Sequence, residues 1–298
     1  MNNKEIIPYF IMKEKGIGQN SNYLCKIISP ILKKEKSVEF INDYAEYYYI
    51  FEAEYNRGKK KDEKCPKYLR QSSYWVDAEI MKIKDKENDW DTKDVVRILA
   101  WKTGNINHEQ SKSEKKIIYL NEEWDEEECS IKLRNGNKQN IKKFAEKVVD
   151  IRKKYSDSSP ENKFGFSDAS IDAWKSLVNE NDVNGLGTVY LITILFFVTK
   201  GKCPIYDRFA MGALLSFENT DKEFKVFPRA IINIKLLPGK LKNQDGKIIE
   251  NKQLLLLLEQ ENIYTYYFGL LRKYFENWSE REVDMALWVY GHFFEVNQ

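Results

Sequence analysis

Two glycines in a turn between helical segments constrain this 298-residue chain more than any other feature. The turn is Asn184-Gly185-Leu186-Gly187, and glycine permits the positive φ angles and close backbone approaches that tight turns need. Residues 191–198 behind the turn are almost entirely apolar. Because this run is too short to cross a bilayer, we expect it to form a buried core helix.

The same turn has the composition of an anion-binding site. Successive backbone N–H groups at a Gly-hydrophobic-Gly turn and at the start of the next helix can hold a phosphate without a cationic side chain. We expect Leu186 to anchor the turn in the core. A Gly-Leu-Gly triplet is weak evidence alone, since Gly16-Ile17-Gly18 occurs in the same chain and a plain helix stop is the simpler interpretation.

A carboxylate follows the apolar helix. Pro204-Ile205-Tyr206 leads to Asp207, and the apolar residues 209–214 begin another helix. The simplest role of Asp207 is an N-cap that accepts hydrogen bonds from this helix. A capping carboxylate is also held in a fixed direction, so the same residue can serve in catalysis.

The order of turn, helix, proline loop and aspartate resembles the helix-hairpin-helix DNA glycosylase superfamily (HhH-GPD) over roughly residues 170–217. The resemblance implies a mainly α, two-lobed helical protein with the helix-hairpin-helix motif at the lobe interface. It implies a helical bundle over 37–203, and a second lobe made of 1–36 plus 204–298 that carries the catalytic aspartate. The expected activity is hydrolysis of the N-glycosidic bond of a damaged, mismatched or modified base in double-stranded DNA, in repair or anti-phage defence.

The resemblance also implies roles for individual residues. Asp207 takes the place of the catalytic carboxylate. The residues expected to bind DNA phosphate are Gly185, Leu186, Gly187 and Thr188. The residues expected near the base pocket are Tyr206, Trp101, Lys102 and Val189, although an aromatic side chain is more commonly part of a core.

Two departures from the superfamily pattern narrow the expected chemistry. Members that also cleave the DNA strand carry a Schiff-base lysine about 18 residues before the aspartate, and this position is Val189. Some members hold an iron–sulfur cluster with four cysteines near the C-terminus, whereas no cysteine follows Cys203. We therefore expect a monofunctional glycosylase with no metal, iron–sulfur cluster or other cofactor.

Charge gives no attraction of the whole molecule to a polyanion, because 48 Lys and Arg stand against 46 Asp and Glu. Local basic patches are therefore needed, and the candidates are Lys33, Lys34 and Lys36, the run Lys59-Lys60-Lys61, and Lys142-Lys143, each of which also fits a solvated surface. The acidic segment, residues 122–128, is expected to lie away from bound DNA.

The four cysteines show no short paired spacing, and the first residues are polar with no long apolar stretch behind them. Both features favour a cytoplasmic protein, and we expect a monomer without membrane contact.

Hydrophobic periodicity predicts helices at most other places. An Asp91 capping start and Gly104 bound one of them, and Ser279 caps the last. Short strands or an extended pair are expected at 117–120 and 131–133, with Asn135-Gly136 as a turn. The other predicted helices are 37–49, 139–154, 170–177, 188–200, one from 224 and one from about 251, with loops at 156–162 and 238–246.

Two other functions are compatible with these residues. A DNA-binding protein without catalysis would use the same turn for phosphate, with Asp207 as a cap only. An unrelated helical interaction protein would carry the Gly-Leu-Gly triplet by chance. Salt-dependent DNA binding separates the last possibility from the other two.

Overall fold

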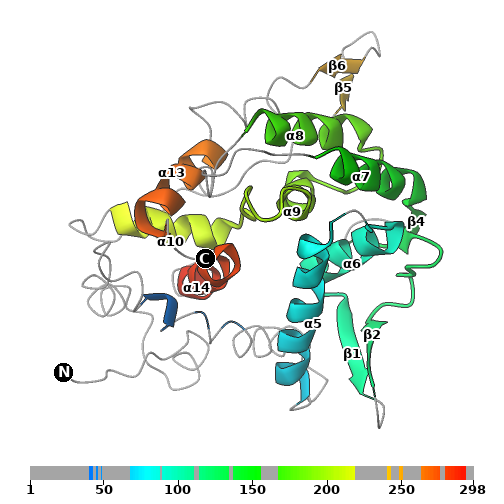
Figure 1. The fold of residues 1–298 in the computed structure, drawn as a ribbon, viewed down its shortest axis with the longest axis horizontal. Helices are drawn as coiled ribbons and strands as arrows, with labels where there is room; N and C mark the ends of the chain where they lie inside the picture. Colours follow the sequence, from blue (N-terminus) through cyan, green and yellow to red (C-terminus); the bar gives the residue numbers. More distant parts are fainter. Residues whose placement is uncertain are drawn as a thin grey trace. The chain divides into compact units, whose positions relative to one another are not determined.

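The computed structural model describes residues 40–42, 45, 48, 68–87, 89–110, 114–133, 137–155, 167–218, 240–242, 248–250, 263–275 and 279–292. Within these residues the protein is mainly α-helical with short antiparallel strand pairs, which confirms the mainly α class predicted from the sequence (Figure 1). None of the helices in this part of the chain has the length and apolar content needed to cross a membrane.

Contacts divide the chain into two compact units. The large unit comprises Ser72–Ile205 and Lys235–Phe268, and the small unit comprises Met1–Gln71, Tyr206–Ile234 and Gly269–Gln298. The domains expected from the sequence differ from this division in residues 37–71, 204–205 and 235–268. The chain passes from the large to the small unit between Ile205 and Tyr206 and again between Phe268 and Gly269.

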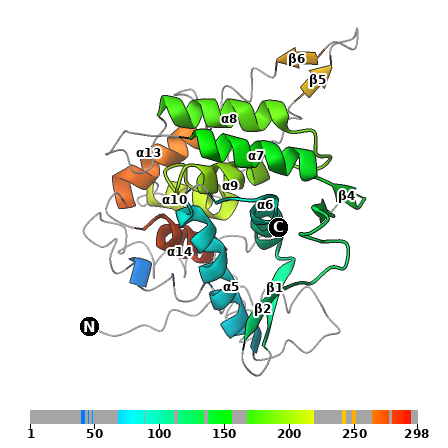
Figure 2. The same ribbon diagram turned by 45° about the vertical axis from the view of Figure 1, so that its right-hand side comes forward.

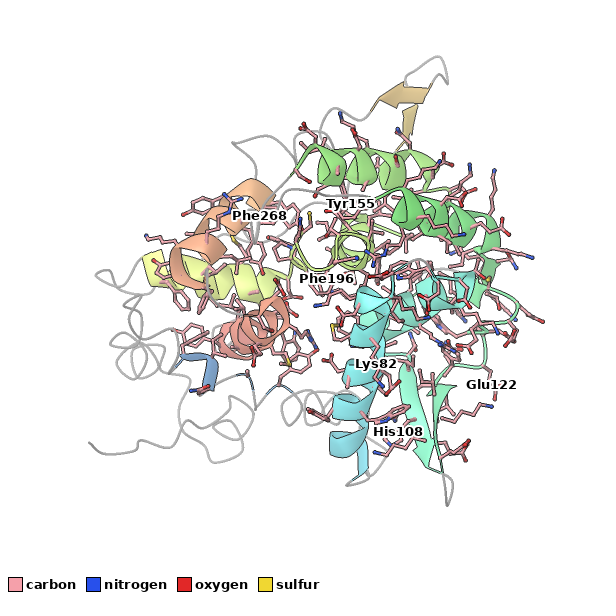
Figure 3. All side chains as sticks on the ribbon, viewed as in Figure 1. Lys82, His108, Glu122, Tyr155, Phe196 and Phe268 are labelled. Carbon is pink, nitrogen blue, oxygen red and sulfur yellow. The ribbon has the colours of Figure 1, made fainter. Side chains whose placement is uncertain are left out.

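Four helices form the core of the large unit: α6 (Thr92–Thr103), α7 (Lys142–Lys154), α8 (Asp168–Glu180) and α9 (Thr188–Val198). Helix α7 lies beside α8, and α9 packs against α6, α7 and α8 (Figures 1 and 2). Nearly every α9 side chain is buried, including Phe196, which is labelled in Figure 3. This confirms the core helix expected after the turn.

Local sequence accounts for the limits of α6. The Asp91 carboxylate accepts a hydrogen bond from the Asp94 N–H group at 3.1 Å, and the Asp94 carboxylate accepts one from the Asp91 N–H group at 3.2 Å. These reciprocal bonds satisfy N–H groups that have no partner inside the helix. Gly104 ends the helix with φ 68°, in the left-handed region that favours glycine. Both predicted helix limits are confirmed.

The strands form three separate antiparallel pairs: β1 (Ile106–Gln110) with β2 (Lys115–Tyr119), β3 (Ser130–Ile131) with β4 (Gln139–Asn140), and β5 (Lys240–Lys242) with β6 (Ile248–Glu250). The two segments predicted as strands therefore lie in different pairs. Strand β5 replaces part of the loop predicted at 238–246. The Asn135-Gly136 turn lies outside the described residues.

Helix α7 begins later than predicted. The sequence predicts a helix over 139–154, but Gln139 and Asn140 pair with β3 and the helix begins at Lys142. The Ile141 N–H group donates to the Cys129 carbonyl at 2.8 Å, and the Lys142 N–H group donates to the Asn140 side chain at 2.9 Å. Pairing with the preceding strand β3 thus decides where the helix begins, and the amphipathic period does not contain that information.

A buried arginine joins three helix ends in the large unit. Arg152 of α7 donates to the carbonyl of Val198 at 2.7 Å, and to the carbonyls of Lys84 and Lys86 at the end of α5 (Tyr68–Asp85). Its guanidinium lies over the Trp90 ring, 5.2 Å from the centroid. Burial lowers the pKa of Arg152. The partial negative charge of helix carbonyls compensates for the buried cation and fixes the ends of α5 and α9.

The small unit has an aromatic core formed by α10 (Arg208–Glu218), α14 (Glu280–His292) and the end of α13 (Ile263–Phe275). The Phe40 ring lies 5.4 Å from the ring of Phe217 and 5.3 Å from that of Tyr290. This packing explains why Phe40 belongs with α10 and α14, although the sequence assigned it to the helical bundle.

The remaining helix and loop predictions are either confirmed or lie outside the described residues. The predicted cap of the last helix is confirmed, because the Glu282 N–H group donates to Ser279 at 3.3 Å. The predicted helix over 37–49 falls largely outside the described residues. The same is true of the loop at 156–162 and of the helix starts at 224 and about 251.

Candidate functional site

The turn between α8 and α9 has the backbone geometry that its glycines suggest. Gly185 has φ 81°, a conformation that strains other residues. Gly187 is the N-cap of α9 with φ −86° and ψ 178°, and no side chain caps this helix. Only Gly185 therefore needs glycine for its φ angle, whereas Gly187 leaves the start of α9 uncovered.

Asn181 holds the turn from inside. Its Nδ2 atom donates to the Leu186 carbonyl at 2.9 Å, and its Oδ1 atom accepts from the Val183 N–H group at 3.3 Å. The Leu186 N–H group donates to the Val183 carbonyl at 3.3 Å. Leu186 itself is only 3% exposed, which confirms the expected anchoring of the turn in the core.

Several backbone donors of the turn are open. Among the described residues, no acceptor is present for the N–H groups of Gly185, Gly187, Thr188 and Val189. Gly185 is exposed and Gly187 is half-buried, whereas Leu186 and Thr188 are buried. An anion at this turn would therefore meet glycine backbone, and the Thr188 side chain offers it almost no surface.

The lysines near the turn fall into two groups, those with a carboxylate partner and those without one. In the large unit, Lys147 pairs with Glu180 at 3.8 Å, and Lys138 pairs with Glu128 at 3.4 Å. Lys142 and Lys143 are exposed at the start of α7 and have no ion pair among the described residues. Their charge adds to the positive end of the α7 dipole, so the start of α7 is a locally electropositive surface.

The end of the acidic segment, residues 122–128, is linked to the turn through strand β4. The Glu128 carbonyl accepts a hydrogen bond from Asn140 of β4, and Gln139 on the same strand contacts Asn184. Glu122, labelled in Figure 3, is exposed. Four other carboxylates of the segment have cationic partners: Glu123 with Lys132, Glu126 with Arg97, Glu127 with Lys93, and Glu128 with Lys138. Because these carboxylates are paired with cations, the segment repels an anion less strongly than its sequence suggests.

Asp207 is the N-terminal cap of α10 in the small unit. Its Oδ1 atom accepts a hydrogen bond from the Phe209 N–H group at 2.8 Å, and its carbonyl accepts one from Met211 at 2.9 Å. The residue is partly exposed. The structure thus confirms the helix predicted after Asp207 and fixes one oxygen of its carboxylate in the cap.

The backbone that leads to Asp207 is held within the large unit. Tyr264 donates to the Pro204 carbonyl at 2.6 Å, and Tyr267 donates to the Ile205 carbonyl at 3.2 Å. The Cys203 N–H group donates to the Thr199 hydroxyl at 3.1 Å. All of these residues are buried, so the proline loop has a defined path up to Ile205.

The residues predicted near a base pocket have different environments. Tyr206 is 1% exposed, and burial raises its pKa, with a further contribution from Asp207. A base cannot stack on this ring without rearrangement. Trp101 donates to Asp77 at 3.1 Å and packs edge-on against Phe197.

The predicted site residues do not all belong to the same unit. Lys102 and Val189 are partly exposed, and they belong to the large unit together with Trp101 and the turn. Tyr206 and Asp207 belong to the small unit. In the described part of the chain, no group of three or more His, Cys, Asp or Glu side chains is placed to hold a metal ion.

Sequence reasoning missed the two polar side chains that hold the turn, Asn181 and Gln139. A signal existed for Asn181, because Asn commonly bonds to the backbone a few residues away. Gln139 gave no such signal, because it lies 45 residues from Asn184.

Comparison of the whole chain with known protein families, curated proteins and solved structures finds no match.

Proposed function

We propose that this protein is a monofunctional DNA glycosylase that hydrolyses the N-glycosidic bond of a damaged, mismatched or modified base. The observation that carries the proposal is the ordered Gly185-Leu186-Gly187 turn with open N–H groups at the start of α9. Backbone donors of this kind bind phosphate whatever the base sequence, as an enzyme that surveys double-stranded DNA requires.

The lysines at the start of α7 support the choice of a polyanionic partner. Lys142 and Lys143 lie just beyond Gln139, whose side chain contacts the turn. Lysines next to phosphate release counterions from DNA, and this release drives binding. The net charge of +2 then matters little, since only the local surface meets the duplex.

Asp207 is the proposed catalytic carboxylate. Cleavage of an N-glycosidic bond builds positive charge on the sugar, much as glycoside hydrolysis does. A carboxylate near the sugar stabilises that charge and orients or deprotonates the attacking water. The capping bond to Phe209 uses Oδ1 of Asp207, so the direction of the carboxylate is set before DNA binds.

The target base has to leave the duplex before an enzyme can reach its glycosidic bond. Tyr206, Trp101, Lys102 and Val189 remain the proposed residues near the extruded base. Trp101 is the best placed of them for a stacking role, because the residue is partly exposed while its ring N–H group is held by Asp77.

Hydrolysis without strand cleavage follows from Val189, which has no amine to form a Schiff base with the sugar. Borohydride should trap no covalent adduct between protein and DNA, and the product strands should stay intact until heated in alkali. A strongly trapped adduct would show that a lysine acts as nucleophile, with Lys200 and Lys202 the first to replace.

A single experiment tests the activity. The protein is incubated with genomic and phage DNAs that differ in base modification, and released bases are identified by mass spectrometry. Release of one base type supports the proposal. Salt-dependent DNA binding with no base released from any substrate would favour the second candidate, a DNA-binding protein without catalysis, in which Asp207 acts only as the observed cap.

A further inference from the structure

A glutamine from a distant strand holds the turn that precedes α9. Gln139 Nε2 donates to the Asn184 carbonyl at 2.7 Å, and Gln139 Oε1 accepts from the Asn184 N–H group at 3.1 Å. One side-chain amide therefore satisfies both backbone groups of one residue, as a neighbouring strand would. Both bonds are exposed to solvent, so burial alone does not explain them.

The backbone of Gln139 is itself fixed. Gln139 pairs with Ile131 across the β3–β4 ladder, and the next residues are tied to Cys129 through the Ile141 N–H group. Leu133, just after β3, lies under the turn: its Cδ1 atom is 3.6 Å from the place where a Cβ atom of Gly185 would be. The turn therefore rests on β3–β4 through one apolar contact and two hydrogen bonds.

These contacts separate the donors of the turn into two sets. The N–H groups of Asn184 and Leu186 are used internally, whereas those of Gly185 and Gly187 are open among the described residues. A turn ordered before binding loses less conformational entropy when a ligand arrives. The open donors can then bind an anion without first rearranging the turn.

We infer that Gln139 is a positioning residue for the phosphate contact, an inference that rests on the proposed DNA-binding function. Gln139 acts through Asn184 and donates nothing to the DNA itself. Its two solvent-exposed bonds contribute little to global stability, because water competes for both partners. Their loss therefore changes the conformation of the turn and the affinity for DNA, with little change in the unfolding temperature.

Gln139→Ala tests the inference, with Asn140→Ala as its matched control. Asn140 lies on the same strand and also makes two side-chain bonds to backbone, to Glu128 and Lys142, but neither bond reaches the turn. Two measurements are made on the full chain. Hydrogen exchange follows the Asn184 and Leu186 amides without DNA, and fluorescence anisotropy follows binding to a short labelled duplex.

Gln139→Ala should speed exchange of both amides and weaken duplex binding about tenfold, whereas Asn140→Ala should leave both within about twofold. Unchanged exchange in Gln139→Ala would overturn the inference. Fast exchange with wild-type affinity would overturn it as well, because the turn would then need no ordering. If the wild-type protein binds no duplex, the proposed function fails, and the exchange comparison still decides whether Gln139 orders the turn.

Discussion

The turn before α9 and the turn before α10 both open a helix with proposed site residues, but they are held in different ways. The first depends on side chains from elsewhere, since Gln139 lies 45 residues from Asn184. The helix start at α10 is capped by its own residue, because Asp207 accepts hydrogen bonds from Phe209 and Met211 within α10, while Tyr264 and Tyr267 hold the loop before it.

This difference separates two kinds of function that a helix start can serve. At α9 no side chain caps the first N–H groups, and those of Thr188 and Val189 have no acceptor among the described residues. At α10 a carboxylate fills that place itself and holds negative charge at the positive end of the helix. The first arrangement suits binding of phosphate, and the second suits presentation of a carboxylate.

The largest expected effect comes from Asp207→Asn. Asparagine caps a helix about as well as aspartate, so the free energy of unfolding should change by less than about 0.5 kcal/mol. Base release should fall at least a hundredfold, since loss of a main electrostatic stabiliser commonly costs about 3 kcal/mol or more. Single-turnover base release and thermal unfolding measure the two quantities.

Asp91→Asn is the matched control, because Asp91 caps α6 by the same kind of bond. It should leave base release unchanged. If Asp207→Asn instead lowers stability steeply and keeps activity on a confirmed substrate, Asp207 is a cap only, and this result would falsify the proposed mechanism.

A smaller effect is expected from Gly185→Ala. Alanine at φ 81° strains the backbone by about 1–2 kcal/mol, while the added Cβ meets Leu133 at an ordinary contact distance. DNA affinity should fall about tenfold for all base sequences alike, because phosphate contacts carry no sequence information.

Gly104→Ala provides the comparison, since Gly104 has φ 68° and no neighbour within 4 Å of an added Cβ. Its stability loss should be similar, with DNA affinity unchanged. Equal losses of affinity in the two variants would mean that general destabilisation, rather than the turn, governs binding.

The smallest effect is expected from the charges beside the turn. Replacing Lys142 and Lys143 together by Gln should weaken binding several-fold and reduce the slope of log affinity against log salt by about two. Lys153 and Lys154 are also exposed and lie at the other end of the same helix, roughly 16 Å away. Their replacement by Gln should leave the slope nearly unchanged, and equal slopes for both double variants would place the DNA elsewhere.

Most of the helical structure could be predicted where the signal lies within a few residues. The capping box at Asp91, the end at Gly104 and the helix after Asp207 depend on neighbouring backbone groups, and all three are confirmed. The start of α7 was wrong because its first two predicted residues pair with a strand instead. That strand pairing is also what presents Gln139 to the turn.

The sequence alone determined the mainly helical class, the buried helix after the turn, the anchoring of Leu186 and the cap at Asp207. These depend on periodicity, side-chain size and bonds between neighbours, which the order of residues contains. Only the tertiary structure decided that Gln139 holds Asn184, that Thr188 is buried, and that the acidic segment is largely paired with cations. Such contacts join residues far apart in the chain, and no local pattern specifies which of many polar side chains will meet.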